Sequence, residues 1–267
     1  MLPEGAPVAG VTSLRDEIYL LRGKDSDQVE VYSADTYCLL RCLTVPGARA
    51  FTDMTACEYF LCLYICDSIA ECVHRLDLID NATRWPVGDV PCTLSVNPHS
   101  HSVVVTCNRA GRIKEFSPGG DLLRDVALPD DVANPWHAIP LPGGGGGFVA
   151  CHGTYGDPVH GVCRLGSDGR LTASHADRSG SDVCRYDVPY HMAIDDDEFV
   201  FVADRNNRQV TLLSPTLEYK RQVVSADQIK WKPHRLCLDA ERRRLYVTYN
   251  ERKDGNYTLG RVVVFRV

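Results

Sequence analysis

Short runs of apolar residues, bounded by polar turns, recur along the whole chain. The clearest example is FVFVA, which ends at Ala203 and is followed by a polar turn and a second run that begins at Val210. Runs of this length that are rich in Val, Ile, Phe and Tyr are typical of half-buried strands. We find no amphipathic helical stretch of useful length, so the pattern predicts an all-β protein.

The runs repeat in a fixed order in six units. One apolar strand ends, a polar turn follows, and the next strand begins on a β-branched residue with a large apolar residue three positions later. The strands before the turn end at Leu21, Cys66, Thr106, Ala150, Ala203 and Thr248. The β-branched positions are Val29, Val73, Ile113, Val162, Val210 and Val262. The large apolar positions are Tyr32, Leu76, Phe116, Leu165, Leu213 and Phe265.

Each unit opens at an anchor position, and successive anchors lie 39 to 54 residues apart. The anchors are Pro7, Thr52, Pro91, Pro135, Pro189 and Pro233. An internal repeat of this length built from short strands is the signature of a β-propeller. We therefore predict a six-bladed β-propeller of four-stranded antiparallel blades, as a single domain over residues 1–267. The predicted blades cover residues 7–47, 48–89, 90–132, 133–180, 181–227 and 228–267.

Closure of the ring is the open point of this prediction. The sequence ends at Val267, just after the third strand of the last unit. We expect the last blade to lack its outer strand or to borrow it, and residues 1–6 are barely long enough to supply one. The same observation leads us to expect a fragment of a longer protein, which we expect to be monomeric in this form.

Composition narrows the class of partner and the compartment. The formal net charge of −6 disfavours a general nucleic-acid binder. Most of the 12 cysteines lie in or beside apolar strands, outside any paired zinc-site spacing, so we expect reduced thiols in a cytoplasmic protein. No segment is long and apolar enough to predict a membrane span. No motif predicts a bound cofactor, because the glycines from Gly143 to Gly147 have no following helix or Lys.

The fifth unit carries a family resemblance. Asp204, Asn207, Arg208 and Val210 follow the order of an NHL repeat, in which an apolar strand ends in Val-Ala-Asp and continues through Asn and Arg to a β-branched strand. The chain thus resembles NHL-repeat propellers, and in particular the C-terminal NHL domain of TRIM-type proteins. That resemblance implies a recognition module, as in substrate recognition by TRIM-type ubiquitin ligases or in binding of single-stranded RNA. No RING or B-box pattern is present, so no ligase chemistry is assigned to this chain.

The candidate site follows from the propeller geometry. The start of each inner strand and the turn between the second and third strands lie on one face, at the mouth of the central channel. The anchors are followed there by Trp136-His137, Tyr190-His191 and His234-Arg235, and we match these pairs with Asp53-Met54 in the second unit. The predicted partner-binding residues are Trp136, His137, Tyr190, His191, Arg205, Asn207, His234, Arg235, Tyr249 and Asn250.

Three interpretations of this face remain open. Aromatic and Arg groups are typical anchors of a protein or peptide ligand, and they also stack on RNA bases. The histidines are alternatively structural groups that hydrogen-bond the backbones of neighbouring blades. A third interpretation is a metal held by His137, His191 and His234, as in peptidylglycine amidating lyase, whose propeller this one resembles in outline. Against it, His137 and His191 lie one position later than His234 relative to the anchor, so their side chains point the other way.

The sequence therefore predicts a non-enzymatic recognition module that binds a protein or peptide partner at the channel mouth. Single-stranded RNA binding and a metal-dependent lyase or hydrolase activity are the alternatives. We predict no catalytic residue, no cofactor and no membrane association. His137, His191 and His234 are the only metal candidates.

Overall fold

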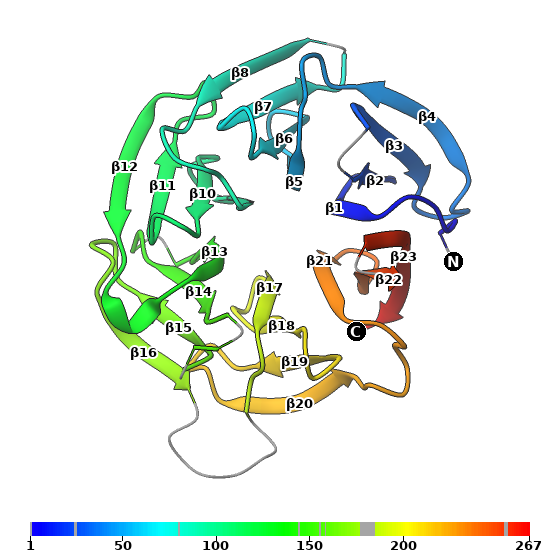
Figure 1. The fold of residues 1–267 in the computed structure, drawn as a ribbon. Helices are drawn as coiled ribbons and strands as arrows, with labels where there is room; N and C mark the ends of the chain where they lie inside the picture. The colour runs from blue at the N-terminus through cyan, green and yellow to red at the C-terminus, as the bar shows by residue number, and fades with distance from the viewer. Residues whose placement is uncertain are drawn as a thin grey trace.

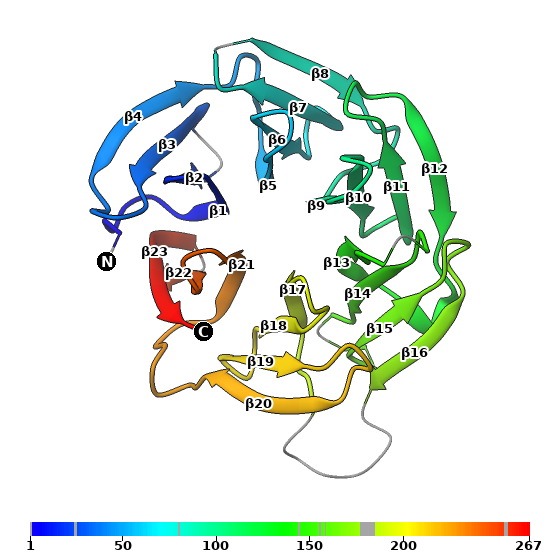
Figure 2. The same cartoon turned by 180° about the vertical axis from the view of Figure 1, so that it is seen from behind.

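The computed structural model describes residues 2–23, 26–79, 81–143, 145–154, 156–157, 159–176, 185–253 and 256–267. Six antiparallel sheets stand around one axis, in chain order, and form a closed ring (Figures 1 and 2). Five sheets have four strands and the last has three, as the predicted six-bladed propeller requires. In the described ranges, the only helical element is the short 3-10 helix η1, Asp130–Val132. None of the described helical structure is long and apolar enough to cross a bilayer.

Within each sheet the strands follow one another from the axis outward. The first sheet comprises β1 Val8–Leu14, β2 Glu17–Arg22, β3 Gln28–Ser33 and β4 Leu39–Thr44. The second comprises β5 Phe51–Cys57, β6 Cys62–Asp67, β7 Cys72–Asp77 and β8 Ala82–Pro86. The third comprises β9 Thr93–Val96, β10 Val103–Cys107, β11 Arg112–Phe116 and β12 Leu122–Ala127.

The remaining sheets follow the same plan. The fourth comprises β13 Pro135–Pro140, β14 Phe148–His152, β15 Gly161–Leu165 and β16 Leu171–Ala176. The fifth comprises β17 Pro189–Ile194, β18 Val200–Asp204, β19 Gln209–Leu213 and β20 Tyr219–Val224. The sixth comprises β21 Pro233–Asp239, β22 Arg244–Lys253 and β23 Asn256–Arg266.

Burial explains why the second strand of each unit is the most apolar. All six residues of β6 are buried, whereas most residues of the outer strands β4 and β12 are exposed. The apolar clusters form between neighbouring sheets: Tyr19 and Leu21 of β2 belong to the same cluster as Leu63 and Ile65 of β6. Packing of blade against blade therefore supplies the core, and the outer strands cover only its rim.

Five of the six inner strands carry a β-bulge near their first residue, and β9 is the exception. In β13 the ladder register shifts between Pro135 and His137, so that Trp136 is the extra residue. The same shift occurs in β17 around Tyr190 and in β21 around His234. A bulge leaves one residue unpaired and turns the strand locally, so successive side chains are aimed at different levels of the ring centre.

This register corrects our alignment of the second unit. The sequence placed Thr52 at the anchor and matched Asp53-Met54 with Trp136-His137. The structure pairs Phe51 with Asp67 and shifts register between Phe51 and Asp53. Asp53 is therefore the counterpart of His137, and the prediction was wrong by one residue because Thr52 occupies the bulge, where no ladder partner constrains the residue type.

The ring is closed by contacts between the two ends of the described chain. The side-chain amide of Asn250 in β22 accepts from Val8 N at 2.8 Å and donates to Val8 O at 2.9 Å. Gly5 pairs with Gly260 of β23 through an isolated antiparallel bridge, with N–O distances of 3.2 and 2.8 Å. One residue of the N-terminal segment thus lies where a fourth strand would begin, and the sixth sheet otherwise keeps three strands.

Candidate functional site

Three of the predicted residues form a contiguous row, which we call the aromatic row: Trp136, Tyr190 and His234. The ring centroids of Trp136 and Tyr190 lie 4.6 Å apart, and those of Tyr190 and His234 lie 5.0 Å apart. All three side chains are half-buried. They are the bulge residues of three consecutive inner strands, so the repeat itself brings residues 54 and 44 positions apart into contact.

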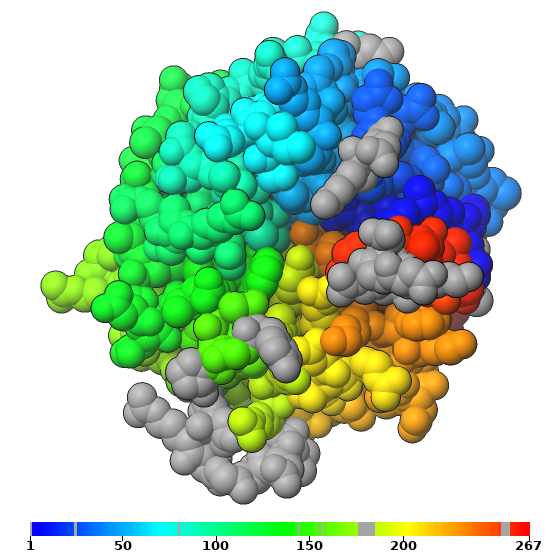
Figure 3. Space-filling view, viewed as in Figure 1, coloured from blue at the N-terminus to red at the C-terminus, as the bar shows by residue number. Residues whose placement is uncertain are grey.

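Arg205 completes this row from the turn between β18 and β19. Its guanidinium carbon lies 4.7 Å from the centroid of the Tyr190 ring, within the range of a cation–π contact. Its Nη2 also donates to the hydroxyl of Tyr257 at 2.6 Å. Figure 3 shows the face of the propeller that carries these turns, with segments of the fourth, fifth and sixth blades in green, yellow and orange around its centre.

Two buried polar atoms on this face make no hydrogen bond. Among the described residues, neither Nδ1 of His234 nor Nε of Arg205 has a hydrogen-bond partner, although both atoms are buried. Burial, followed by the charges of Arg235 and Arg205, lowers the pKa of His234 well below its usual value, so the ring is neutral at pH 7. Unpaired polar atoms beside half-buried aromatic rings are the groups that a ligand can satisfy.

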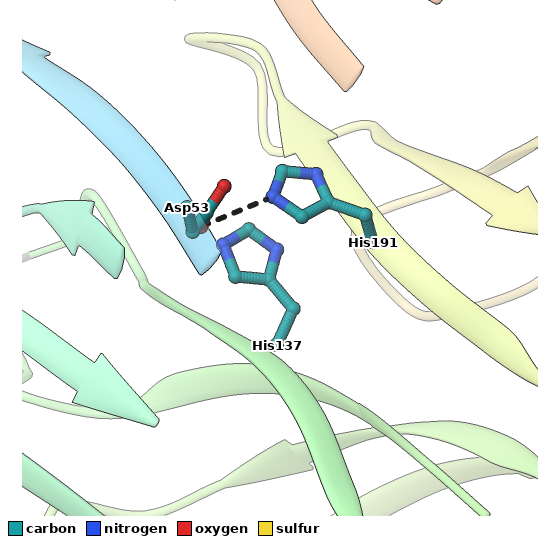
Figure 4. Close-up of side chains that lie close together, drawn as sticks. All are labelled: Asp53, His137 and His191. Carbon is teal, nitrogen blue, oxygen red and sulfur yellow. Dashed lines mark ion pairs between the residues drawn. The ribbon is translucent and has the colours of Figure 1, made fainter. Parts of the chain in front are cut away.

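A second group of residues lies one level deeper and forms what we call the buried cluster: Asp53, His137, His191 and Arg235. Figure 4 shows the first three of them. The predicted central channel is filled here by side chains that are at most 6% exposed. Asp53 Oδ1 and Arg235 Nε form an ion pair at 2.8 Å, and Asp53 Oδ2 accepts from Leu94 N at 2.9 Å. The imidazoles of His137 and His191 stack with centroids 3.8 Å apart.

Hydrogen bonds fix the tautomer of both histidines. His137 Nδ1 accepts from Met192 N at 3.1 Å, and His191 Nδ1 accepts from Leu236 N at 3.2 Å. Each neutral ring therefore carries its proton on Nε2, which His137 donates to Leu94 O at 3.1 Å. These are bonds to the backbones of neighbouring blades, as the structural interpretation of the histidines predicts.

The same bonds argue against a metal in the buried cluster. One atom each of Asp53, His137 and His191 lies within 4.8 Å of the others, which is close enough for a shared ion. A ligand imidazole needs a free lone pair, however, and at Nε2 that requires the proton to move to Nδ1, which faces a backbone N–H donor. Arg235 also places a cation against the carboxylate. The donor set therefore does not fit a metal, and His234 lies in the aromatic row instead.

Charge in the buried cluster is balanced within the protein. Burial works to raise the pKa of Asp53, but the charge of Arg235 and the interaction with His191 outweigh it and hold the pKa at about 2. Burial lowers the pKa values of His137 and His191, so both rings are neutral at pH 7. The cluster thus holds one carboxylate and one guanidinium, and it joins strands β5, β9, β17 and β21.

The remaining predicted residues serve as supports around the row. Asn207 donates to Asp204 Oδ2 at 2.7 Å and to Arg185 O at 2.8 Å. Tyr249 is 7% exposed, and Asn250 is engaged with the first blade as described above. Asp53 is the member of the buried cluster that sequence reasoning missed. The sequence did offer one signal for Asp53, which was its position relative to Cys66, the last residue of the predicted second strand and its ladder partner in the structure.

Comparisons with known proteins agree with the architecture. No protein-family model matches the sequence, and no curated protein is similar enough to count as a relative. Among solved structures, Kuenenia stuttgartiensis hydrazine synthase matches all of this chain and 97% of its own, with a TM-score of 0.67 at 15% identity. Virginiamycin B lyase from Staphylococcus aureus matches all of this chain and 88% of its own, with a TM-score of 0.66 at 11% identity.

A third structure extends the range of functions among these neighbours. A chain of the nidogen/laminin complex aligns with 86% of this chain over 85% of its own length, with a TM-score of 0.67 at 14% identity. Identities this low establish a common fold and no common activity. The chain is a six-bladed β-propeller whose neighbours include both enzymes and a protein of a binary complex.

Proposed function

We propose that this propeller is a non-enzymatic recognition module that binds a protein or peptide segment through the aromatic row and Arg205. The observation that carries the proposal is the pair of unpartnered buried atoms, His234 Nδ1 and Arg205 Nε, beside three half-buried rings. Tyr, Trp and Arg are the residue types most enriched at the energetic centres of interfaces. A polar backbone or carboxyl group of the partner would satisfy both atoms, while its apolar side chains would cover the rings.

The rigidity of the row supports this function. The Trp136 indole donates to Gly153 O at 3.0 Å, and Arg205 is held by both Tyr190 and Tyr257. Side chains that are already ordered lose little conformational entropy when a partner binds. In the buried cluster beneath the row, Asp53 pairs with Arg235, and Nδ1 of both histidines accepts from backbone N–H groups, although His191 Nε2 has no hydrogen-bond partner among the described residues. These bonds favour recognition over metal-dependent lyase or hydrolase chemistry at the centre of the ring.

We further propose that the units are NHL-type repeats and that the protein acts in the cytoplasm, as the substrate-recognition domain of a TRIM-type protein does. The role of Asp204 supports the repeat assignment, because its carboxylate accepts from Asp187 N, Asn207 and Gln209 and so fixes the turn that carries Arg205. Free thiols support the compartment: the eleven cysteines that the structure describes form no disulfide.

A quantitative pull-down tests the proposal. Immobilised protein is incubated with extract, and recovered partners are compared between the wild type, Tyr190→Ala, Arg205→Glu and the control Arg221→Glu, which makes the same charge change on the exposed outer strand β20. We expect each site variant to recover at least tenfold less of the specific partners, which corresponds to about 1.4 kcal/mol or more, and the control to match the wild type. Equal recovery by all four proteins would refute the site.

Single-stranded RNA is the second candidate, because bases can stack on aromatic side chains such as those of the half-buried aromatic row. The net charge of −6 disfavours it. Nuclease treatment of the extract separates the two: recovery that survives nuclease and depends on Tyr190 supports a protein ligand. Retention of a labelled oligonucleotide that falls linearly with the logarithm of salt concentration would favour RNA instead.

A further inference from the structure

Two cysteines face each other at the end of the hairpin between β5 and β6. Cys57 and Cys62 are direct ladder partners, and they form the last pair before the turn 58–61. Directly opposed residues in an antiparallel pair have Cα atoms about 4.5–5.5 Å apart. A disulfide bridges Cα atoms about 4.4–6.8 Å apart. The backbone therefore already holds the two thiols at a separation that a disulfide can span.

The position of Cys57 in its turn favours a negatively charged atom. In the third sheet the equivalent residue is Asn97, whose Oδ1 accepts from His99 N at 2.9 Å and from Ser100 N at 3.1 Å. In the sixth sheet it is Asp239, which accepts from Arg242 N at 3.0 Å. The second sheet thus places a sulfur where other blades place an acceptor oxygen, and the N–H groups of Phe60 and Tyr59 help to lower its pKa.

These contacts distinguish the two thiols. The hydrogen bond from Cys62, opposed by burial but aided by the two N–H groups, lowers the pKa of Cys57 to about 6. The same bond and burial raise the pKa of Cys62. Elsewhere in the core burial dominates, and it raises the pKa of Cys163 to about 12. Cys57 is therefore the more acidic and more nucleophilic thiol of the pair, whereas Cys163 is an inert buried thiol.

The pair lies one layer beneath the surface. Cys57 and Cys62 are at most 1% exposed, but the turn above them is exposed, with Tyr59 at 69%. The Tyr59 ring stacks on His101 of the neighbouring blade with centroids 4.2 Å apart and ring planes within 10°. The N–H groups of Tyr59 and Phe60, which help to lower the pKa of Cys57, belong to the same turn as this exposed aromatic contact.

We propose that Cys57 and Cys62 form a redox-responsive dithiol that peroxides convert to a disulfide within the β5–β6 hairpin. The Cys57 thiolate attacks one oxygen of hydrogen peroxide, the O–O bond breaks, and hydroxide leaves to give a sulfenic acid. Cys62 loses its proton to that hydroxide and attacks the Cys57 sulfur, so that the S–S bond forms and the S–O bond breaks. Two thiols and one hydrogen peroxide thus give one disulfide and two waters. The site is independent of the aromatic row.

Peptide mapping of the folded chain tests the proposal. The wild type is treated with one equivalent of hydrogen peroxide, blocked with N-ethylmaleimide during unfolding, digested and analysed by mass spectrometry. We expect the peptide that contains residues 57 and 62 to be lighter by two hydrogens and unlabelled at these two residues, with label only on its other cysteines, Cys66 and Cys72. Its rate of formation should rise with pH to a plateau, with a midpoint near 6. Full labelling of both cysteines, or a midpoint near the usual thiol pKa of about 8.5, would overturn the proposal.

Variants assign the roles of the two sulfurs. Cys62→Ser should stop the reaction at a Cys57 sulfenic acid that dimedone traps, and Cys57→Ser should slow oxidation of Cys62 at least tenfold. Cys163→Ser, a buried control, should give the wild-type yield of disulfide. Oxidation of Cys62 at an unchanged rate in Cys57→Ser would contradict the proposed order of attack. The wild-type pH profile needs no substitution, so the proposal can be refuted even where a variant fails to fold.

Discussion

The ion pair between Asp53 and Arg235 gives the most demanding prediction. Its charged groups are 1% and 2% exposed, and the pair joins the inner strands of the second and sixth blades. Asp53→Asn keeps the size of the side chain and an acceptor for Leu94 N, but it leaves the guanidinium buried without a counter-charge. Breaking a buried pair in this way costs about 3–5 kcal/mol, which is a large share of a total stability of about 5–15 kcal/mol.

Urea unfolding measures this loss. The change in free energy is followed in parallel by tryptophan fluorescence and circular dichroism, because coincident transitions are needed for two-state treatment. We expect Asp53→Asn to lower the free energy of unfolding by about 4 kcal/mol. The double variant Asp53→Asn/Arg235→Met should lose less than the sum of the two single variants, by about 2–3 kcal/mol, because removal of both charges relieves the uncompensated cation.

Two results would refute this reasoning. A loss below about 1 kcal/mol for Asp53→Asn would mean that water or neighbouring carbonyls solvate Arg235 in the ring centre. Additive losses in the double variant would mean that the two residues do not interact, whatever their 2.8 Å separation suggests.

Three further predictions concern ring closure and pH. Asn250→Ala removes both bonds to the Val8 backbone and should lower the free energy of unfolding by about 1–3 kcal/mol in urea titrations. Gly260→Ala would place a Cβ 2.5 Å from a backbone oxygen of the N-terminal segment, so its melting temperature should fall by several degrees, whereas the control Gly145→Ala, with open space around it, should be neutral. Burial raises the pKa of Asp204 from 3.8 to about 6, so the folded state binds its proton more tightly. Between pH 4 and pH 7 the wild type should therefore lose about 2 kcal/mol relative to Asp204→Asn, and a pH-independent difference would contradict this.

The repeat pattern was sufficient to predict the fold because strand order and blade packing depend on apolar periodicity. Val210 and Leu213 occupy positions that recur in every unit, and both are fully buried. The alignment of the second unit was wrong by one residue because of the bulge. Thr52 occupies the unpaired position of that bulge, so the repeat pattern does not restrict the residue type there. A slip of one residue exchanges the two levels of the ring centre, and this concealed the partnership of Asp53 with Arg235.

The sequence also could not predict how deeply each candidate residue is buried. Tyr190 and His191 are adjacent in the chain, yet the bulge leaves one in the half-buried aromatic row and carries the other into the buried cluster. Similarly, the side-chain amide of Asn250 could bind a ligand, or it could hydrogen-bond the backbone of another blade as a strand residue would. Only the spatial position of Val8 decides between them.

The bridge between Gly5 and Gly260 limits when, during synthesis, the ring can close. Its partners are 255 residues apart, so the first blade must wait, with one flank uncovered, until β23 has been synthesised. The ring should therefore close only after β23 has been made, and a chain truncated before β21 would hold five formed blades in an open, aggregation-prone arc.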